Sequence, residues 1–307
     1  MEKKILVTGS SGVLGTALKR ELMKREDVQI LCPSRNELNL LNFDQTMAYF
    51  DQNRPEEIYH LASIVYGLKG NLSNQWEAIH LNTIINDNVF SACKEFLPKK
   101  IFFASTVATY PQGAANPLRE EDTFLGLPHW GEFGYAFSKR HAYGYLEILK
   151  KEFGIDYCYG LFTNIYGPND RFNAETGHVI PSLIIKAHFA HKSKSHKLMV
   201  WGNKKTTRDF IYSEDAARAV VFAMNHLSGK VNISTNVETA IEQVVDEILK
   251  SYPGVEPIWC KDEPVGISNR VVDNSILLKK GWQPLVPISL GIKRTIDWLE
   301  SSSFVRS

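Results

Sequence analysis

The sequence predicts an α/β protein in which a doubly wound parallel sheet is combined with a smaller, interleaved C-terminal domain. Short apolar runs alternate with longer amphipathic segments as far as about residue 161, which is the pattern of repeated strand–helix–strand units. A glycine-rich turn joins the first strand to the first helix. After Phe162 the sequence becomes irregular and polar, and strand-like residues return later without a low-complexity linker. The second domain is therefore predicted to be interleaved with the first.

The first domain is predicted from apolar strand runs, each followed by a helix with apolar residues every three or four positions. Strands are expected at residues 4–8 (KILVT), 28–32, 57–60, 100–104 and 156–161. Helices are expected at residues 13–24, 43–53, 75–96 and about 133–153. Because parallel neighbours need a crossover connection, this order predicts right-handed βαβ units.

The rest of the chain has shorter and less regular elements. Residues 163–168 (TNIYGP) are turn-like, and Asp215 is expected to cap a helix that ends near His226. Further helices are expected at residues 179–190, 239–250 and 289–299, and strands at 198–201, 209–212 and 230–233. We assign residues 1–165, completed by about 208–235, to the first domain, and residues 166–207 and 236–307 to the second.

The composition excludes several classes of protein. With 44% hydrophobic residues, 22% charged residues and a formal net charge of +1, the chain can bury a large core and is not expected to bind nucleic acid or a membrane surface. We expect no signal peptide and no membrane span, and hence a cytoplasmic protein. No metal site is expected, and His188, His191 and His196 are interpreted as surface residues. The cysteines form no Cys-x-x-Cys pair and are expected to be free thiols: Cys32, Cys93, Cys158 and Cys260.

The glycine run after the first strand predicts a dinucleotide site of the Rossmann type. Gly9 allows a tight turn, Gly12 lets the backbone approach a pyrophosphate, and Gly15 lets the helix pack closely on the strand. The phosphates would lie at the helix N-terminus, where free N–H groups and the helix dipole favour an anion.

The end of the second strand predicts which dinucleotide binds. An Asp or Glu there usually accepts hydrogen bonds from the ribose of NAD, but this chain reads Leu-Cys-Pro-Ser-Arg at residues 31–35. Arg35, with Ser34 or Ser11, could instead hold a 2′-phosphate, because guanidinium donors match phosphate geometry. The prediction is NADP(H).

Tyr135 and Lys139 are spaced for one face of a helix. A phenol has a reference pKa of about 10, and a neighbouring ammonium is expected to move that pKa toward neutrality. Ser105 follows an apolar strand, at the sheet edge where such folds bind ligands. A Tyr-x-x-x-Lys spacing often occurs by chance, so its interpretation depends on these other residues.

Together these residues resemble the extended short-chain dehydrogenase/reductases. The glycine spacing G-x-x-G-x-x-G, Ser105, Tyr135 and Lys139 fit that family, and the chain is most similar to its GDP-L-fucose synthases. The matching motifs cover nearly the whole chain: RNELNLL at 35–41, TNIYGP at 163–168, HVIP at 178–181, VWG at 200–202 and RDF at 208–210.

The resemblance implies the role of each site residue. Ser105 would hydrogen-bond the C4 carbonyl oxygen of a GDP-linked 4-keto sugar, Tyr135 would protonate that oxygen as NADPH delivers hydride to C4, and Lys139 would tune Tyr135. The implied cofactor residues are Gly9, Ser11, Gly12, Val13, Gly15, Arg35, Asn39, Leu40, Leu61, Ala62, Asn82, Lys139, Phe162, Asn164 and Ile165. The implied substrate residues are Thr106, Val107, Asn164, His178, Val179, Lys186, Trp201, Arg208 and Arg270. A homodimer paired through the helices near 75–96 and 133–153 is also implied.

Val107 departs from the family pattern. The family epimerises its substrate with a cysteine at this position and a histidine that matches His178. Valine cannot move a proton, and a positioned acid or base contributes about 10²–10⁴-fold. We therefore expect a C4 reductase that lacks C3/C5 epimerase activity. The sequence leaves open whether the sugar is a 6-deoxyhexose or a heptose.

Two other functions stay open. One is a bifunctional GDP-L-fucose synthase in which another residue replaces the missing thiol, and the other is a non-catalytic NADP-binding regulator or scaffold. A 4,6-dehydratase would need an Asp-Glu pair where Val107 and Ala108 stand, and a 4-epimerase is disfavoured by Arg35.

Overall fold

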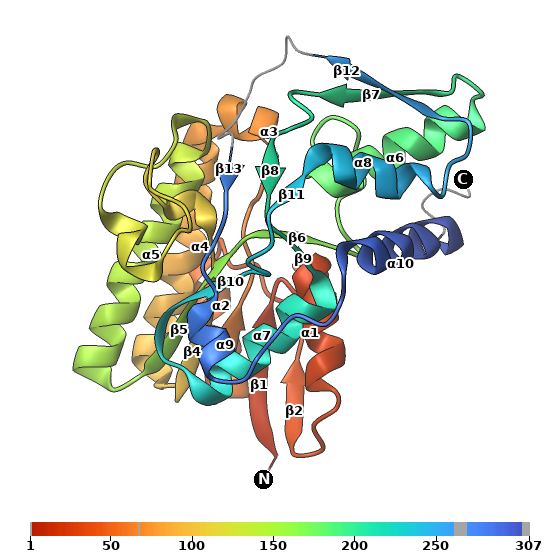
Figure 1. Ribbon diagram of the computed structural model, residues 1–307. Coiled ribbons are helices and arrows are strands. Elements are labelled where there is room, and N and C mark those ends of the chain that lie inside the picture. The colour runs from red at the N-terminus through yellow and green to blue at the C-terminus, as the bar shows by residue number, and fades with distance from the viewer. Residues whose placement is uncertain (1, 67, 261–268, 303–307) are drawn as a thin grey trace.

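A computed structural model describes residues 2–66, 68–260 and 269–302 of the protein. Its centre is a six-stranded sheet in the order β10-β5-β4-β3-β1-β2, in which all neighbouring strands are parallel (Figure 1). The strands are β1 (Lys3–Thr8), β2 (Val28–Leu31), β3 (Glu57–His60), β4 (Lys100–Thr106), β5 (Asp156–Phe162) and β10 (Gly229–Ile233). The predicted doubly wound parallel sheet is therefore confirmed.

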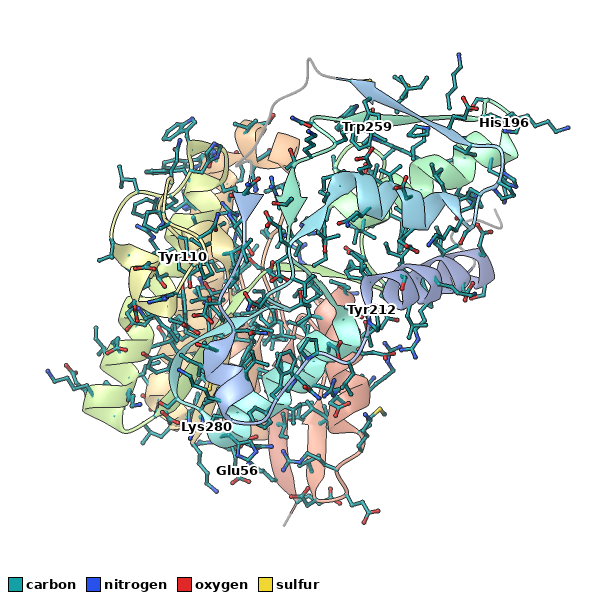
Figure 2. All side chains as sticks on the ribbon, viewed as in Figure 1. Glu56, Tyr110, His196, Tyr212, Trp259 and Lys280 are labelled. Carbon is teal, nitrogen blue, oxygen red and sulfur yellow. The ribbon has the colours of Figure 1, made fainter. Side chains whose placement is uncertain are left out.

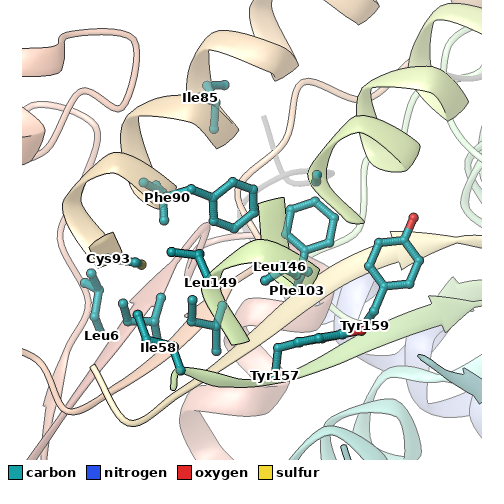
Figure 3. Packing of buried hydrophobic residues seen from close by; sticks show 14 of the residues in the cluster. Leu6, Ile58, Ile85, Phe90, Cys93, Phe103, Leu146, Leu149, Tyr157 and Tyr159 are labelled. Carbon is teal, nitrogen blue, oxygen red and sulfur yellow. The ribbon is translucent and has the colours of Figure 1, made fainter. Parts of the chain in front are cut away.

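Helices cover both faces of the sheet, and the alternation of side chains along each strand divides the core in two. One face is covered by α2 (Phe43–Asn53), α4 (Gln75–Phe96) and α5 (Phe133–Phe153). Leu6, Ile58 and Phe103 belong to the apolar cluster of this layer, in which the Phe103 ring packs against Phe90 of α4 (Figure 3). The other face is covered by α1 (Val13–Leu22) and α7 (Ser213–His226).

A third apolar cluster lies among elements of the C-terminal part. It involves α6 (Val179–Lys192), β7 (Lys197–Trp201), α8 (Ile241–Leu249) and α10 (Ile288–Ser301), and β7 pairs with β12 (Glu256–Cys260). Glu56, at the amino end of β3, lies far from Trp259 of β12 (Figure 2). The carboxyl ends of the central strands therefore point toward this cluster. The predicted domain boundaries themselves remain a prediction.

Short elements connect the two parts of the molecule. They are β6 (Asn164–Tyr166) paired with β9 (Phe210–Tyr212), β8 (Thr207–Arg208) between β11 (Thr239–Ala240) and β13 (Asn269–Arg270), α3 (Leu68–Ser73), α9 (Ser275–Lys279), and the 3-10 helices η1 (Val107–Thr109), η2 (Glu120–Phe124) and η3 (Trp130–Glu132). No helix in the described ranges has both the length and the apolar character that a membrane crossing requires.

Four local predictions were wrong. Asp215 lies in the first turn of α7 and does not cap it; its carboxylate accepts the N–H groups of Leu285 and Val286. The turn-like stretch at 163–168 contains β6, because its backbone pairs with β9. The helix expected from residue 239 begins at Ile241, since residues 239–240 pair with β8.

The fourth wrong prediction concerns His188, which was interpreted as a surface residue. It is only 2% exposed, because the buried face of α6 turns it toward α10. Its Nδ1 lies 2.6 Å from Oε1 of Glu300, which also accepts the hydroxyl of Tyr252. The basic residues around His188 are typical of an exposed segment, but the side chain that contacts His188 lies 112 positions away in the sequence.

Candidate active site

A cavity of about 1250 Å³ opens at the carboxyl edge of the sheet. It lies beside β1, where the strand order reverses: the chain passes from β1 to β2 on one side and then to β3 on the other, and doubly wound sheets bind ligands at such a point. Its walls include the β1–α1 turn, the ends of β2, β4 and β5, and parts of α5, α6, β7, β8 and β13. We call it the central cavity. Every residue predicted for the site lines it except Asn82.

The β1–α1 turn fits a pyrophosphate. Gly9 has φ of +71°, and a Cβ on it would lie 2.8 Å from the backbone nitrogen of Ala62. A Cβ on Gly15 would lie 2.2 Å from the carbonyl oxygen of Gly9, so both positions require glycine. Gly12 is the N-cap of α1, and no side chain caps the helix there. The free N–H groups of this helix end therefore face the cavity and can bind an anion.

A positively charged side chain, Arg35, follows the end of β2 close to this turn. Arg35 is exposed and lines the cavity, as does Lys19 of α1. The carboxylate of Glu37 accepts the backbone N–H of Ser34 at 2.7 Å, and this hydrogen bond lowers the pKa of Glu37. That carboxylate thus stabilises the turn, and Arg35 lines the cavity beside it, where a guanidinium could bind a 2′-phosphate.

Asn82 was predicted to bind the cofactor, but in the structure its side chain makes hydrogen bonds within the protein. It is 1% exposed on α4, and its Oδ1 accepts the N–H of Ile64 at 2.7 Å and the hydroxyl of Ser63 at 2.8 Å. Its Nδ2 donates to the carbonyl oxygens of Ile64 and Ala78. Asn82 therefore positions the loop after β3, which includes the cavity-lining Leu61 and Ala62, and does not line the cavity itself.

The three predicted catalytic side chains meet on one side of the cavity. Ser105, near the end of β4, is 4% exposed. Its Oγ has no hydrogen bond of normal geometry to another described residue. Burial raises the pKa of the nearby Tyr159 phenol, and the Ser105 side chain opposes that rise. Tyr135 and Lys139 are one turn apart on α5, with Lys139 Nζ 5.5 Å from the centre of the Tyr135 ring. A ketone oxygen placed here could accept from both Ser105 and Tyr135.

Burial dominates the protonation of this pair. Burial lowers the pKa of Lys139 to about 7, since no ion pair forms on it in the described ranges and its Nζ lies 4.8 Å from the Phe103 ring centre. Burial also raises the pKa of Tyr135 to about 12, against a lowering effect of Ser63. The predicted lowering of the phenol pKa by Lys139 is therefore not seen, because both groups are removed from water.

His178 and Val107 occupy the positions predicted for epimerase chemistry. His178 is the N-cap residue of α6, and its Nδ1 lies 3.8 Å from Oδ1 of Asp170. Burial opposes protonation of the imidazole, but the hydrogen bond and charge of Asp170 outweigh it and raise the pKa of His178. Val107 lines the same cavity and is 5% exposed. Cys93 and Cys158 are fully buried in the core, so neither supplies the missing thiol.

Cationic side chains line the part of the cavity formed by the C-terminal elements. Lys186 Nζ lies 3.7 Å above the ring centre of Trp201, and Arg270 binds Glu132 at 3.1 Å. Burial and the nearby charge of Arg270 lower the pKa of Arg208 to about 10, so Arg208 remains charged at neutral pH. This wall suits a nucleoside diphosphate.

Several cavity-lining polar residues were not predicted from the sequence, among them Asn71, His129, Glu132 and Asp170. Glu132 and Asp170 stand close to the motifs at Tyr135 and His178, and that proximity was the one indication of their role. Nothing in the local sequence indicates that Asn71 reaches the cavity.

Comparisons with known proteins agree with this arrangement. Residues 5–237 match the model of the NAD dependent epimerase/dehydratase family. The chain is 30% identical over 299 residues to GDP-L-fucose synthase 1 of Arabidopsis thaliana, covering 96% of this chain and 92% of that protein.

Two solved structures are also similar. One is a GDP-6-OMe-4-keto-L-xylo-heptose reductase from C. jejuni, with a TM-score of 0.91, 24% identity and 98% of each chain covered. The other is a GDP-L-fucose synthetase from Naegleria fowleri bound to NADP, with a TM-score of 0.88, 25% identity and coverage of 98% of this chain and 94% of that chain. Because the family model spans most of the chain and the plant relative aligns over nearly its whole length, the protein belongs to the NAD dependent epimerase/dehydratase family, among the extended short-chain dehydrogenase/reductases that include the GDP-L-fucose synthases.

Proposed function

We propose that the protein is an NADPH-dependent C4 reductase of a GDP-linked 4-keto sugar and that it lacks C3/C5 epimerase activity. The observation that supports this best is the composition of one cavity: Ser105, Tyr135 and Lys139 line it together with the glycine turn, whereas position 107 has valine. The NADP bound to the similar Naegleria fowleri structure and the fucose synthase name of the plant relative agree with the proposal.

The residues of the chain would act in a single reduction step. The glycine turn and Arg35 would hold NADPH, which would supply a hydride for C4. Ser105 donates a hydrogen bond to the C4 oxygen, and Tyr135 donates the proton that this oxygen takes as it becomes an alcohol. A phenol with a pKa of about 12 holds its proton at neutral pH, so it is in the correct state to act as the acid. Lys139, with its Nζ 5.5 Å from the centre of the Tyr135 ring, would supply a positive charge beside it when protonated.

The substrate would lie with its diphosphate toward the basic wall. Arg208 and Arg270 offer planar donors to phosphate oxygens, and Lys186 adds a charge without bidentate geometry. The ketone is then directed to Ser105 and Tyr135 on the opposite side. The homodimer implied by the resemblance, paired through α4 and α5, is part of the same proposal.

Hydrogen exchange at carbon tests the absence of epimerase activity. The protein is incubated in D₂O with a GDP-4-keto sugar and no NADPH, and proton NMR follows the C3 and C5 positions against a sample without enzyme. We expect no enzymatic inversion at C3 or C5, because Val107 cannot move a proton and His178 alone serves one face of the ring. Val107→Cys is the matched variant, which places a thiol in the cavity with His178 and is expected to introduce exchange. Deuterium incorporation with inversion in the wild type, at a rate comparable to reduction, would instead identify a bifunctional synthase.

Arg35 tests the cofactor assignment. Arg35→Ala is expected to lower kcat/KM for NADPH by about 10- to 100-fold, because a charged pair to the 2′-phosphate is lost. The much weaker activity with NADH should change by less than about threefold, since NADH has no 2′-phosphate. Arg20→Ala on the exposed face of α1 is the control, because Arg20 does not line the cavity. An equal loss with both cofactors would show that Arg35 does not read the 2′-phosphate.

A further inference from the structure

One polar wall of the central cavity has no role in the reduction described above. It consists of Asn71 on α3, His129 and Glu132, and all three side chains line the cavity. None of them belongs to the glycine turn, the catalytic trio or the position of the missing cysteine. Their chemistry, an amide, an imidazole and a carboxylate, is that of a site for hydroxyl groups.

The residues of this wall come from two chain segments that flank Tyr135. On one side, the Tyr135 phenol interacts with the side chain of Ser63, which lies in the loop between β3 and α3. On the other side, Glu132 is three positions before Tyr135 in the chain. The amide of Gln75 joins the two segments, since it donates to the carbonyl oxygen of Trp130 at 2.6 Å and accepts the N–H of Gly134 at 2.7 Å. A group bonded to the carbon next to the reacting C4 therefore comes within reach of this wall.

Asn71 gives the strongest indication that a ligand is expected. It is 5% exposed, and its Oδ1 is buried with no hydrogen-bond partner among the described residues. Buried polar atoms are almost always hydrogen-bonded, and one left without a partner destabilises the fold. Because Asn71 itself lines the cavity, rotation of its side chain can present this oxygen to a hydroxyl of a bound molecule.

His129 and Glu132 complete a complementary set. Nδ1 of His129 accepts the N–H of Gly131 at 3.1 Å, so the neutral ring has its proton on Nε2 and can donate through it. One carboxylate oxygen of Glu132 is held by Arg270 at 3.1 Å, which orients the group beside the cavity. The wall therefore offers acceptors and a donor within one small region.

We propose that Asn71, His129 and Glu132 form a subsite for a hydroxylated substituent on C5 of the sugar, so that the substrate is a GDP-linked 4-keto heptose and not a 6-deoxyhexose. A 6-deoxyhexose presents only a methyl group at C6, which would leave the Asn71 oxygen unpaired. A heptose presents hydroxyls on C6 and C7, which can pair with all three side chains. This inference rests on the proposed function and names its substrate class.

The test compares two sugars and two variants by steady-state kinetics with NADPH. The sugars are a GDP-4-keto heptose with C6 and C7 hydroxyls and a GDP-4-keto-6-deoxyhexose. The wild type is expected to favour the heptose by about 10- to 100-fold in kcat/KM, because a site built for hydroxyls discriminates against a ligand that lacks them. Asn71→Leu should lower kcat/KM for the heptose by about tenfold and change that for the 6-deoxyhexose by less than about threefold. Leu72→Ala on the exposed side of α3 is the control and should alter neither value.

The outcomes separate this inference from the proposed function. If the wild type reduces the 6-deoxyhexose as well as or better than the heptose, or if Asn71→Leu lowers both equally, the subsite is refuted and the C4 reductase stands. If neither sugar is reduced, the proposed function fails and the subsite with it. Asn71→Ala, which adds no bulk, replaces Asn71→Leu should the latter not fold.

Discussion

Tyr135→Phe is expected to lower the rate of NADPH oxidation with a GDP-4-keto sugar by about 10³-fold or more. The phenol is the acid that protonates the C4 oxygen, and a positioned acid of this kind contributes about 10²–10⁴-fold. Its pKa of about 12 means that the wild type holds the proton throughout the physiological pH range. The loss should appear in kcat, with little change in KM, because the ring and its packing remain. Absorbance of NADPH at steady state measures it.

Tyr145→Phe on the same helix is the matched control for Tyr135→Phe. Tyr145 packs against Phe90 of α4 and does not line the central cavity. Loss of its hydroxyl should therefore leave the reduction rate within about twofold, because mutations outside the site rarely alter the barrier. Equal rates for Tyr135→Phe and the wild type would remove the proposed mechanism and favour a non-catalytic NADP-binding protein.

Lys139→Met is expected to stabilise the protein while abolishing most of its activity. Lys139 is 2% exposed and has no ion pair within the described ranges, and a buried charge replaced by an apolar side chain of similar size often stabilises a fold by about 1–4 kcal/mol. We therefore expect the Tm to rise by about 3–8 °C and kcat to fall by about 100-fold or more, since the ammonium near Tyr135 is lost. Calorimetry and the NADPH assay measure the two effects. Lys151→Met, at an exposed position of α5, should change neither.

The stability of the wild type should depend on pH, because Lys139 has different pKa values in the folded and unfolded protein. The pKa of Lys139 is lowered from 10.5 to about 7 in the folded protein. Between these values the unfolded chain holds a proton that the folded chain has released, so the free energy of unfolding of the wild type rises with pH. The slope from this group is at most about 1.4 kcal/mol per pH unit. The stability advantage of Lys139→Met should thus be largest below pH 7 and shrink toward pH 10. A constant difference across this range would show that Lys139 keeps its normal pKa.

The sequence alone was enough to predict the central sheet, and it pointed to Ser105, Tyr135 and Lys139, which line one cavity. Strand runs such as KILVT and the helical periodicity around Tyr135 are local patterns, and they determine local structure. The glycine turn could be predicted as well, because the reasons for glycine there are local. Gly9 has a positive φ, and Gly15 lies against the backbone of Gly9. The absence of a cysteine at position 107 could be recognised by comparing the sequence with a family motif.

Only the tertiary structure decided how the remaining groups behave. His188 is buried because α10 supplies Glu300, and Asn82 holds the loop at Ile64 instead of lining the cavity. The pKa of Lys139 depends on burial beside Phe103, which its helix spacing does not reveal. Asn71 and Glu132 line one wall although 61 positions separate them in the chain. In each case the deciding contact joins distant segments, and hydrophobic periodicity and local motifs contain no information about such contacts.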